Sequence, residues 1–151
     1  MVIKFKYFFG SDSRSLPFLS TLHDEIPNLK VITLAPKNKG RGRKSTSNPV
    51  ETFCIENNIE CDYFDDSKNY HDMEYGIVAS FSKIFPNYFL ENNSQLFNIH
   101  LSLLPKYRGP TPVETAILNK EIEGGYTVFK IDKNIDTGKI IFQNSLNIKN
   151  K

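Results

Sequence analysis

The sequence predicts an α/β fold with an open, mostly parallel sheet flanked by helices and an antiparallel strand pair near the C-terminus. Apolar, β-branched and aromatic runs alternate with segments of helical pattern, which is typical of parallel strands joined by helices. The last two strand-like runs lie too close together for a helical crossover, so they favour antiparallel pairing. The 151 residues suffice for one domain with an apolar core, and they contain no internal repeat.

The first half of the chain supplies most of the expected parallel strands. Four runs rich in β-branched and aromatic residues predict strands: Val2–Gly10, Leu29–Ala35, Ile59–Phe64 and Tyr75–Phe81. A short helix is expected over Leu16–Leu22, after a serine-rich turn. Pro49 predicts the start of a second helix, to Asn57, because proline suits the first helical turn.

The second half continues the alternation and makes the predicted sheet Rossmann-like. Pro86 predicts a helix to about Glu91, and Pro112 predicts a helix to Asn119. Glu114 lies in the first turn of the latter, where a carboxylate suits the helix dipole. Three further runs predict strands: Gln95–His100, Gly125–Asp132 and Gly138–Leu146.

Composition excludes several classes of protein. The net charge of +2 is too small to indicate a nucleic-acid partner by itself. Cys54 and Cys61 make neither a disulfide framework nor a zinc site, which favours a reducing compartment. No apolar stretch approaches the ~20 residues that span a bilayer, so no membrane partner is expected.

Asn98 and His100 are the first candidates for chemistry. They lie two residues apart at the end of a predicted strand, so their side chains share one face. Ligands of open α/β sheets bind beyond the carboxyl ends of strands. There an asparagine can donate to a developing oxyanion, and a histidine can move a proton near neutral pH. The alternative, which is commoner for an arbitrary Asn-x-His, is a hydrogen-bonded strand-end histidine beside a turn-forming asparagine.

Asp136 is the second candidate. The run Asp136–Gly138 predicts a tight turn between the last two strands. A carboxylate there can orient an imidazolium and stabilise its charge, as in other histidine-based catalysis. Ordinary turn chemistry is the alternative.

A cationic loop is the third candidate. It follows a predicted strand, contains two glycines and no acidic residue, and carries five cations: Lys37, Lys39, Arg41, Arg43 and Lys44. Such a loop suits contacts with phosphates, although a solvated loop or a localisation signal has the same composition. The loop has no aromatic residue for base stacking.

Taken together, these motifs are more specific than each alone. "FNIHLSLLPKYRGPTPVETAIL", followed by "GYTVFKIDKNIDTGKII", resembles the folate-dependent formyltransferase family, whose signature is Asn-x-His, Ser-Leu-Leu-Pro, a basic turn with glycine, and a downstream Asp-Thr-Gly. "GRGRKSTSNPV" resembles the acceptor-stem loop of the family members that act on initiator methionyl-tRNA. Leu101 and the first loop, "GSDSRS", depart from the usual pattern of those members. The resemblance covers nearly the whole chain.

The resemblance implies a fold, a reaction and a set of site residues. The fold is that of the formyltransferase N-terminal domain. The donor is 10-formyltetrahydrofolate, the acceptor is the amine of methionyl-initiator tRNA, and no metal takes part. The catalytic residues correspond to Asn98, His100 and Asp136, and the cations 37–44 correspond to tRNA contacts. The implied folate contacts are Ser82, Lys83, Ile84, Phe85, Ser102, Leu103, Leu104 and Pro105.

The resemblance also sets expectations for organisation and location. Residues 1–151 are expected to form a catalytic domain that is incomplete at its C-terminal end and lacks the β-barrel domain that grips tRNA. The expected location is the mitochondrial matrix, with the bacterial cytoplasm as the alternative, and the expected state is a monomer. Two other functions stay open: a formyltransferase for a small amine, such as glycinamide ribonucleotide or an amino sugar, and an inactive, truncated folate- or RNA-binding remnant.

Overall fold

The computed structural model describes residues 5–36, 46–68 and 70–149. The chain divides into two compact units, Met1–Phe85 and Pro86–Lys151. The predicted cations Lys37, Lys39, Arg41, Arg43 and Lys44 lie outside the described residues.

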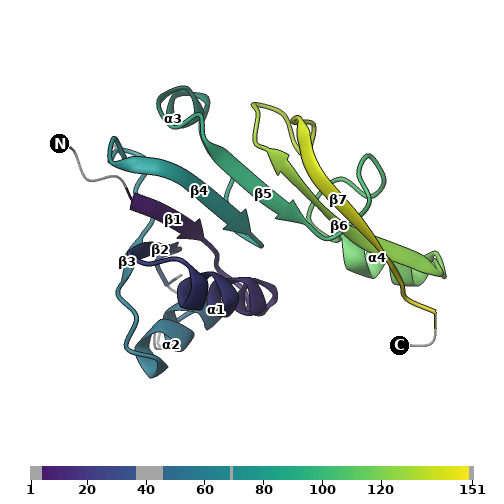
Figure 1. Ribbon diagram of the computed structural model, residues 1–151, viewed down its shortest axis with the longest axis horizontal. Coiled ribbons are helices and arrows are strands. Elements are labelled where there is room, and N and C mark those ends of the chain that lie inside the picture. The colour runs from purple at the N-terminus through teal and green to yellow at the C-terminus, as the bar shows by residue number, and fades with distance from the viewer. Residues whose placement is uncertain (1–4, 37–45, 69, 150–151) are drawn as a thin grey trace, which may run out of the picture. The chain divides into compact units, whose positions relative to one another are not determined.

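The first unit is a parallel sheet with helices against it (Figure 1). Its strands are β1 (Phe5–Phe9), β2 (Leu29–Thr33), β3 (Cys61–Tyr63) and β4 (Met73–Ala79), in the sheet order β3-β2-β1-β4. Its helices are the 3-10 turn η1 (Ser13–Ser15), α1 (Leu16–Glu25) and α2 (Pro49–Glu56).

The start of α2 shows why these residues form a helix at this place. Pro49 begins it, as expected, and the side chain of Asn48 accepts hydrogen bonds from the backbone of Val50 and Glu51 at 3.0 and 3.1 Å. The same oxygen accepts from the hydroxyl of Thr33 at the end of β2. The cap therefore fixes α2 to the end of β2, the strand that precedes it in the chain.

The two faces of the first sheet are covered differently. Phe8 is fully buried, as are Leu19 of α1 and Val50 and Cys54 of α2. Tyr7 and Phe9 alternate with Phe8 and so face the other way. There an aromatic cluster covers the sheet, formed by Tyr7, Phe9, Phe64, Tyr70, Phe81 and Phe85. Loops therefore supply the cover on that face, through ring pairs that contribute about 0.5–1.5 kcal/mol each beyond area burial.

The second unit is antiparallel. It contains α3 (Asn87–Asn92), β5 (Leu96–His100), α4 (Pro112–Leu118), β6 (Glu123–Lys130) and β7 (Ile140–Asn147). Strand β6 pairs antiparallel with β7, which confirms the predicted pair, and it also pairs antiparallel with β5, which the sequence pattern did not indicate. A pattern of apolar residues does not encode strand direction.

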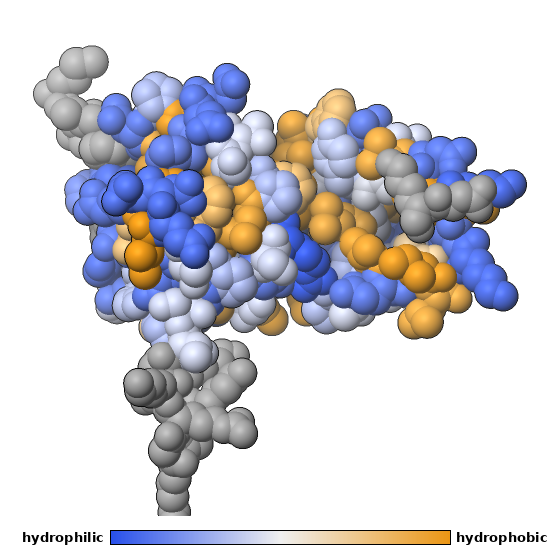
Figure 2. Space-filling model, turned by 90° about the horizontal axis from the view of Figure 1, so that it is seen from below, coloured by the Kyte–Doolittle hydropathy of each residue, from blue (hydrophilic) through white to orange (hydrophobic). Residues whose placement is uncertain are grey.

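The second unit exposes apolar side chains, visible on the right-hand side of Figure 2. Strand β7 is exposed along its whole length, and its exposed apolar residues are Ile140, Ile141, Phe142 and Leu146.

Among the described residues, no helix is long and apolar enough to cross a membrane.

The predicted α/β class is confirmed, with small shifts of boundaries. The strand expected over Tyr75–Phe81 runs over Met73–Ala79 instead. Ser80 takes a left-handed backbone conformation with φ of 46°, so the chain turns there and Phe81 joins the aromatic cluster. Pro86 caps α3 rather than beginning it.

Candidate active site

His100 closes β5 and is held there by the loop that follows. Its side chain is 6% exposed, and its Nε2 lies 2.8 Å from the backbone carbonyl oxygen of Tyr107. A carbonyl oxygen only accepts, so Nε2 carries the proton and donates. The other ring nitrogen, Nδ1, is thereby left to face Asp136.

Asp136 reaches His100 from the loop between β6 and β7. Its Oδ2 lies 3.7 Å from His100 Nδ1 and accepts a hydrogen bond from the backbone N–H of Gly109 at 2.7 Å. The carboxylate is 13% exposed. The structure therefore brings these two predicted residues together as a mostly buried pair, at the distance of an ion pair rather than of a hydrogen bond.

The route of this loop corrects the expected tight hairpin turn. Lys130, the last residue of β6, lies opposite Phe97, three residues or about 10 Å before His100 along β5. Residues 131–139 therefore run back along the unit to place Asp136. Asp132 holds this loop together, because its carboxylate accepts from the hydroxyl of Thr137 and the backbone N–H of Asn134.

Asn98 lies two residues before His100 on β5, so its side chain shares the face of His100. Its backbone is in register with Phe129 of β6, and it is partly exposed. Its role as an oxyanion donor stays a prediction.

The Ser102–Pro105 loop is fixed by bonds within the second unit. The hydroxyl of Ser102 donates to the carbonyl of Lys106 at 2.6 Å, and the backbone N–H of Leu104 donates to the hydroxyl of Thr127 at 3.1 Å. Ser102 and Leu104 are buried, whereas Pro105, after a cis peptide bond, is exposed. The polar side chain of Ser102 thus shapes the loop, and the folate contacts of residues 102–105 stay predictions.

Thr127 and Gln143 are residues that sequence reasoning missed. Thr127, fully buried opposite His100, donates to the carbonyl of Ser102 at 2.7 Å. Gln143 of β7 donates to Thr127 at 2.8 Å and to the carbonyl of Leu104 at 3.0 Å. The sequence did hold a signal for both, because Thr127 and Gln143 are polar residues within strands that are otherwise rich in apolar residues.

The other predicted folate contacts, Ser82 to Phe85, belong to the first unit. The backbone N–H of Ser82 donates to the hydroxyl of Ser11 at 3.0 Å, and Lys83 pairs with Asp66 at 3.1 Å. Phe85 is buried in the aromatic cluster, whereas Ile84 is 74% exposed. Their contact with folate stays a prediction.

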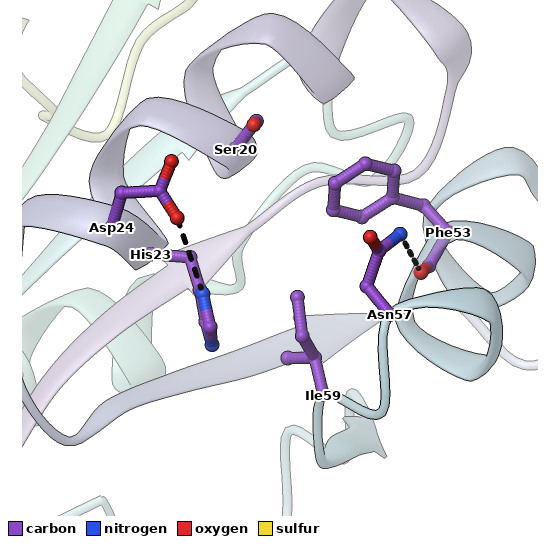
Figure 3. Close-up of a pocket in the computed structure, with 6 residues that line it drawn as sticks. All are labelled: Ser20, His23, Asp24, Phe53, Asn57 and Ile59. Atoms are coloured by element: carbon purple, nitrogen blue, oxygen red, sulfur yellow. Dashed lines mark hydrogen bonds and ion pairs between the residues drawn. The ribbon is translucent and has the colours of Figure 1, made fainter.

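A cavity of about 200 Å³ lies between α1 and α2 in the first unit (Figure 3). None of the predicted site residues lines it. Its lining residues are Ser20, His23, Asp24, Phe53, Asn57 and Ile59. His23 Nδ1 lies 3.9 Å from Asp24 Oδ1, and the Asn57 amide donates to the carbonyl of Phe53 at 2.8 Å. In the described part of the chain, no group of three or more His, Cys, Asp or Glu is placed to hold a metal ion.

The chain is similar in sequence to known proteins over most of its length. The model of the formyl transferase family matches residues 14–151. The methionyl-tRNA formyltransferase of Endomicrobium trichonymphae is 34% identical over 153 residues, which cover 95% of this chain and 49% of that protein. The chain thus spans about half the length of this relative.

Solved structures agree on the fold. A phosphoribosylglycinamide formyltransferase from Streptococcus pneumoniae superposes with a TM-score of 0.74 at 19% identity, covering 96% of this chain and 83% of that one. WlaRD, a sugar 3N-formyl transferase solved with dTDP and 5-N-formyl-THF, superposes with a TM-score of 0.68 at 31% identity, covering 99% and 53%.

Proposed function

Because this chain belongs to the formyl transferase family, we propose that it transfers a formyl group from 10-formyltetrahydrofolate to the amino group of methionyl-initiator tRNA. The observation that carries the choice of acceptor is the 34% identity to a methionyl-tRNA formyltransferase across 95% of the chain. The phosphoribosylglycinamide enzyme shares the fold at only 19% identity.

The His100–Asp136 pair supports a direct acyl transfer. The free amine attacks the formyl carbon, and the formyl oxygen becomes an oxyanion that Asn98 and protonated His100 stabilise. The carbon–nitrogen bond to folate then breaks, the folate nitrogen takes up a proton, and the attacking amine loses one through water held near Asp136. The carboxylate of Asp136, 3.7 Å from Nδ1, offsets the charge of the imidazolium. Losing one oxyanion donor typically costs ~10²–10³ in rate.

The formyl donor and the acceptor are proposed to contact different parts of the chain. For the donor we propose residues 82–85 and 102–105, since the latter loop is fixed directly after His100. For the tRNA we propose the cations between residues 37 and 44. A mitochondrial or bacterial location and a monomeric state stay predictions.

An amino-sugar acceptor is the second candidate. It is favoured by the 31% identity to a sugar 3N-formyl transferase over 99% of this chain. Acceptor specificity therefore has to be measured with both classes side by side.

The experiment compares acceptors with the full chain. Purified protein is incubated with 10-formyltetrahydrofolate and, in turn, methionyl-initiator tRNA, glycinamide ribonucleotide or a dTDP-linked amino sugar, and formylated product is quantified. His100→Ala is the test variant, and His71→Ala, which changes an exposed histidine, is the matched control.

We expect formyl-methionyl-tRNA from the parent and His71→Ala, and a loss of at least about 10²-fold in His100→Ala. Product from the amino sugar alone would move the proposal to the second candidate. Transfer at the parent rate in His100→Ala would refute the role of His100, and no transfer to any acceptor would favour an inactive remnant.

A further inference from the structure

The turn 106–109 contacts both members of the candidate catalytic pair through its backbone. The carbonyl of Tyr107 accepts from His100 Nε2 at 2.8 Å, and the N–H of Gly109 donates to Asp136 at 2.7 Å. The position of this turn therefore decides which ring nitrogen of His100 is engaged and where the carboxylate lies.

The side chain of Tyr107 anchors the turn beyond the end of α4. Its hydroxyl donates to Glu121 Oε1 at 2.5 Å and accepts from the Asn119 amide at 3.2 Å. Lys106 pairs with the same oxygen of Glu121 at 3.3 Å. The hydrogen bond from Tyr107, followed by the one from Lys106, lowers the pKa of Glu121. The carboxylate is thus charged near neutral pH.

The backbone of Tyr107 needs such an anchor. Its φ of 56° lies in the left-handed region, which is unfavourable for a residue with a Cβ. The hydroxyl of Tyr107, on Glu121 and Asn119, and its carbonyl, on His100, hold this conformation, and the bond to Glu121 is the shortest of the three. Releasing the bond to Glu121 lets the turn relax and withdraw the carbonyl.

We propose that Glu121 is a positioning residue that acts through Tyr107: it commits Nε2 of His100 to the Tyr107 carbonyl and so makes Nδ1, beside Asp136, the nitrogen that serves the reaction. This inference rests on the proposed formyl transfer for its chemistry. Its structural half, the state of the His100 ring, holds whether or not the chain transfers formyl groups.

The variants separate the hydroxyl bond from the ion pair. Glu121→Ala and Tyr107→Phe each remove the bond between hydroxyl and carboxylate. Glu121→Gln keeps a carbonyl oxygen that accepts from Tyr107 while losing the charge that pairs with Lys106. Glu123→Ala, the same truncation at an exposed position two residues on, is the matched control.

The first readout is the imidazole of His100, followed by NMR of 15N-labelled histidine. The chain has three histidines, so the signal is assigned by its loss in His100→Asn. In the parent and in Glu123→Ala we expect a protonated Nε2 whose hydrogen exchanges slowly. In Glu121→Ala and Tyr107→Phe we expect faster exchange of that hydrogen, and in Glu121→Gln recovery toward the parent.

The second readout is formyl transfer by the same proteins. In Glu121→Ala and Tyr107→Phe we expect kcat to fall about 10- to 100-fold, with little change in KM for the folate donor, because a small displacement of reacting groups has costs of this order. Glu121→Gln should restore most of kcat.

Parent-like exchange of the His100 hydrogen in Glu121→Ala and Tyr107→Phe would overturn the proposal. A changed signal together with unchanged kcat would also overturn it. If the parent itself transfers no formyl group, the proposed function fails, and the NMR readout alone decides whether Glu121 positions His100.

Discussion

Gly138 should tolerate no side chain, and its replacement tests how the loop after β6 positions Asp136 in the candidate active site. A Cβ at this position would lie 1.7 Å from the carbonyl oxygen of Lys130 and 2.9 Å from its carbonyl carbon. Both atoms belong to the backbone of β6, which is paired with β5 on one side and β7 on the other. The strand cannot retreat, so the loop that contains Gly138 has to move.

The size of this movement follows from the contact. Cβ atoms essentially never approach other heavy atoms closer than 3.0 Å, so the loop must shift by more than about 1 Å. Overpacking of this kind costs typically about 1–3 kcal/mol of unfolding free energy. For a chain of this size, that lowers the thermal midpoint by roughly 2–12 °C.

The same movement displaces Asp136, two residues before Gly138. Its bond of 2.7 Å to Gly109 and its 3.7 Å approach to His100 leave little slack for such a shift. A misplacement of about 1 Å can cost ~10²-fold in rate. Gly138→Ala should therefore lose activity out of proportion to its lost stability.

The assay pairs Gly138→Ala with Gly124→Ala. A Cβ at Gly124 would lie 3.1 Å from Cδ1 and 3.3 Å from Cγ2 of Ile148, side-chain atoms that need to give by only a few tenths of an ångström. Urea denaturation and the rate of formyl transfer are measured for both variants. Parent-like stability and rate in Gly138→Ala, or equal losses in the two variants, would refute the reasoning.

Three further predictions address the loop, the first unit and the cations. Thr127→Val should lower the unfolding free energy in urea by about 1–3 kcal/mol, because buried partners lose their hydrogen bond. Thr115→Val, which removes an exposed hydrogen bond within α4, should cost little, and equal costs would contradict this. Burial, and then the hydrogen bond to Asp72, raises the pKa of Tyr7 from 10.0 to about 12, so its contribution to stability should be present below pH 10 and lost as the pH rises through about 12. Tyr7→Phe should flatten that loss in alkaline unfolding curves, and an unchanged curve would reject it. Replacing Arg41, Arg43 and Lys44 with glutamine should weaken tRNA binding and leave folate affinity unchanged. In titrations at several salt concentrations, each lost phosphate contact should reduce the magnitude of the slope of log K for tRNA against log salt by roughly 0.7–0.9. An unchanged slope would favour the small-amine acceptor.

The sequence by itself determined the local structure and, of the pair His100 and Asp136, the place of His100 at the end of a strand. Pro49 and Pro112 begin helices where they were expected to, because proline supplies a helical φ and needs no N–H partner in the first turn. Asn98 and His100 share a strand face because side chains of a strand alternate. These properties depend on neighbouring residues alone.

Only the tertiary structure decided how the site closes around His100. Asp136 reaches it because β6 runs antiparallel to β5 and the following loop returns about 10 Å, a direction that apolar alternation does not encode. Phe85 packs into the aromatic cluster of the first unit, an arrangement that the sequence pattern did not indicate. Thr127 and Tyr107 hold the loop through hydrogen bonds to residues distant in sequence. Such bonds form only between groups that the folded chain brings within about 3 Å, and no local pattern of residues specifies that.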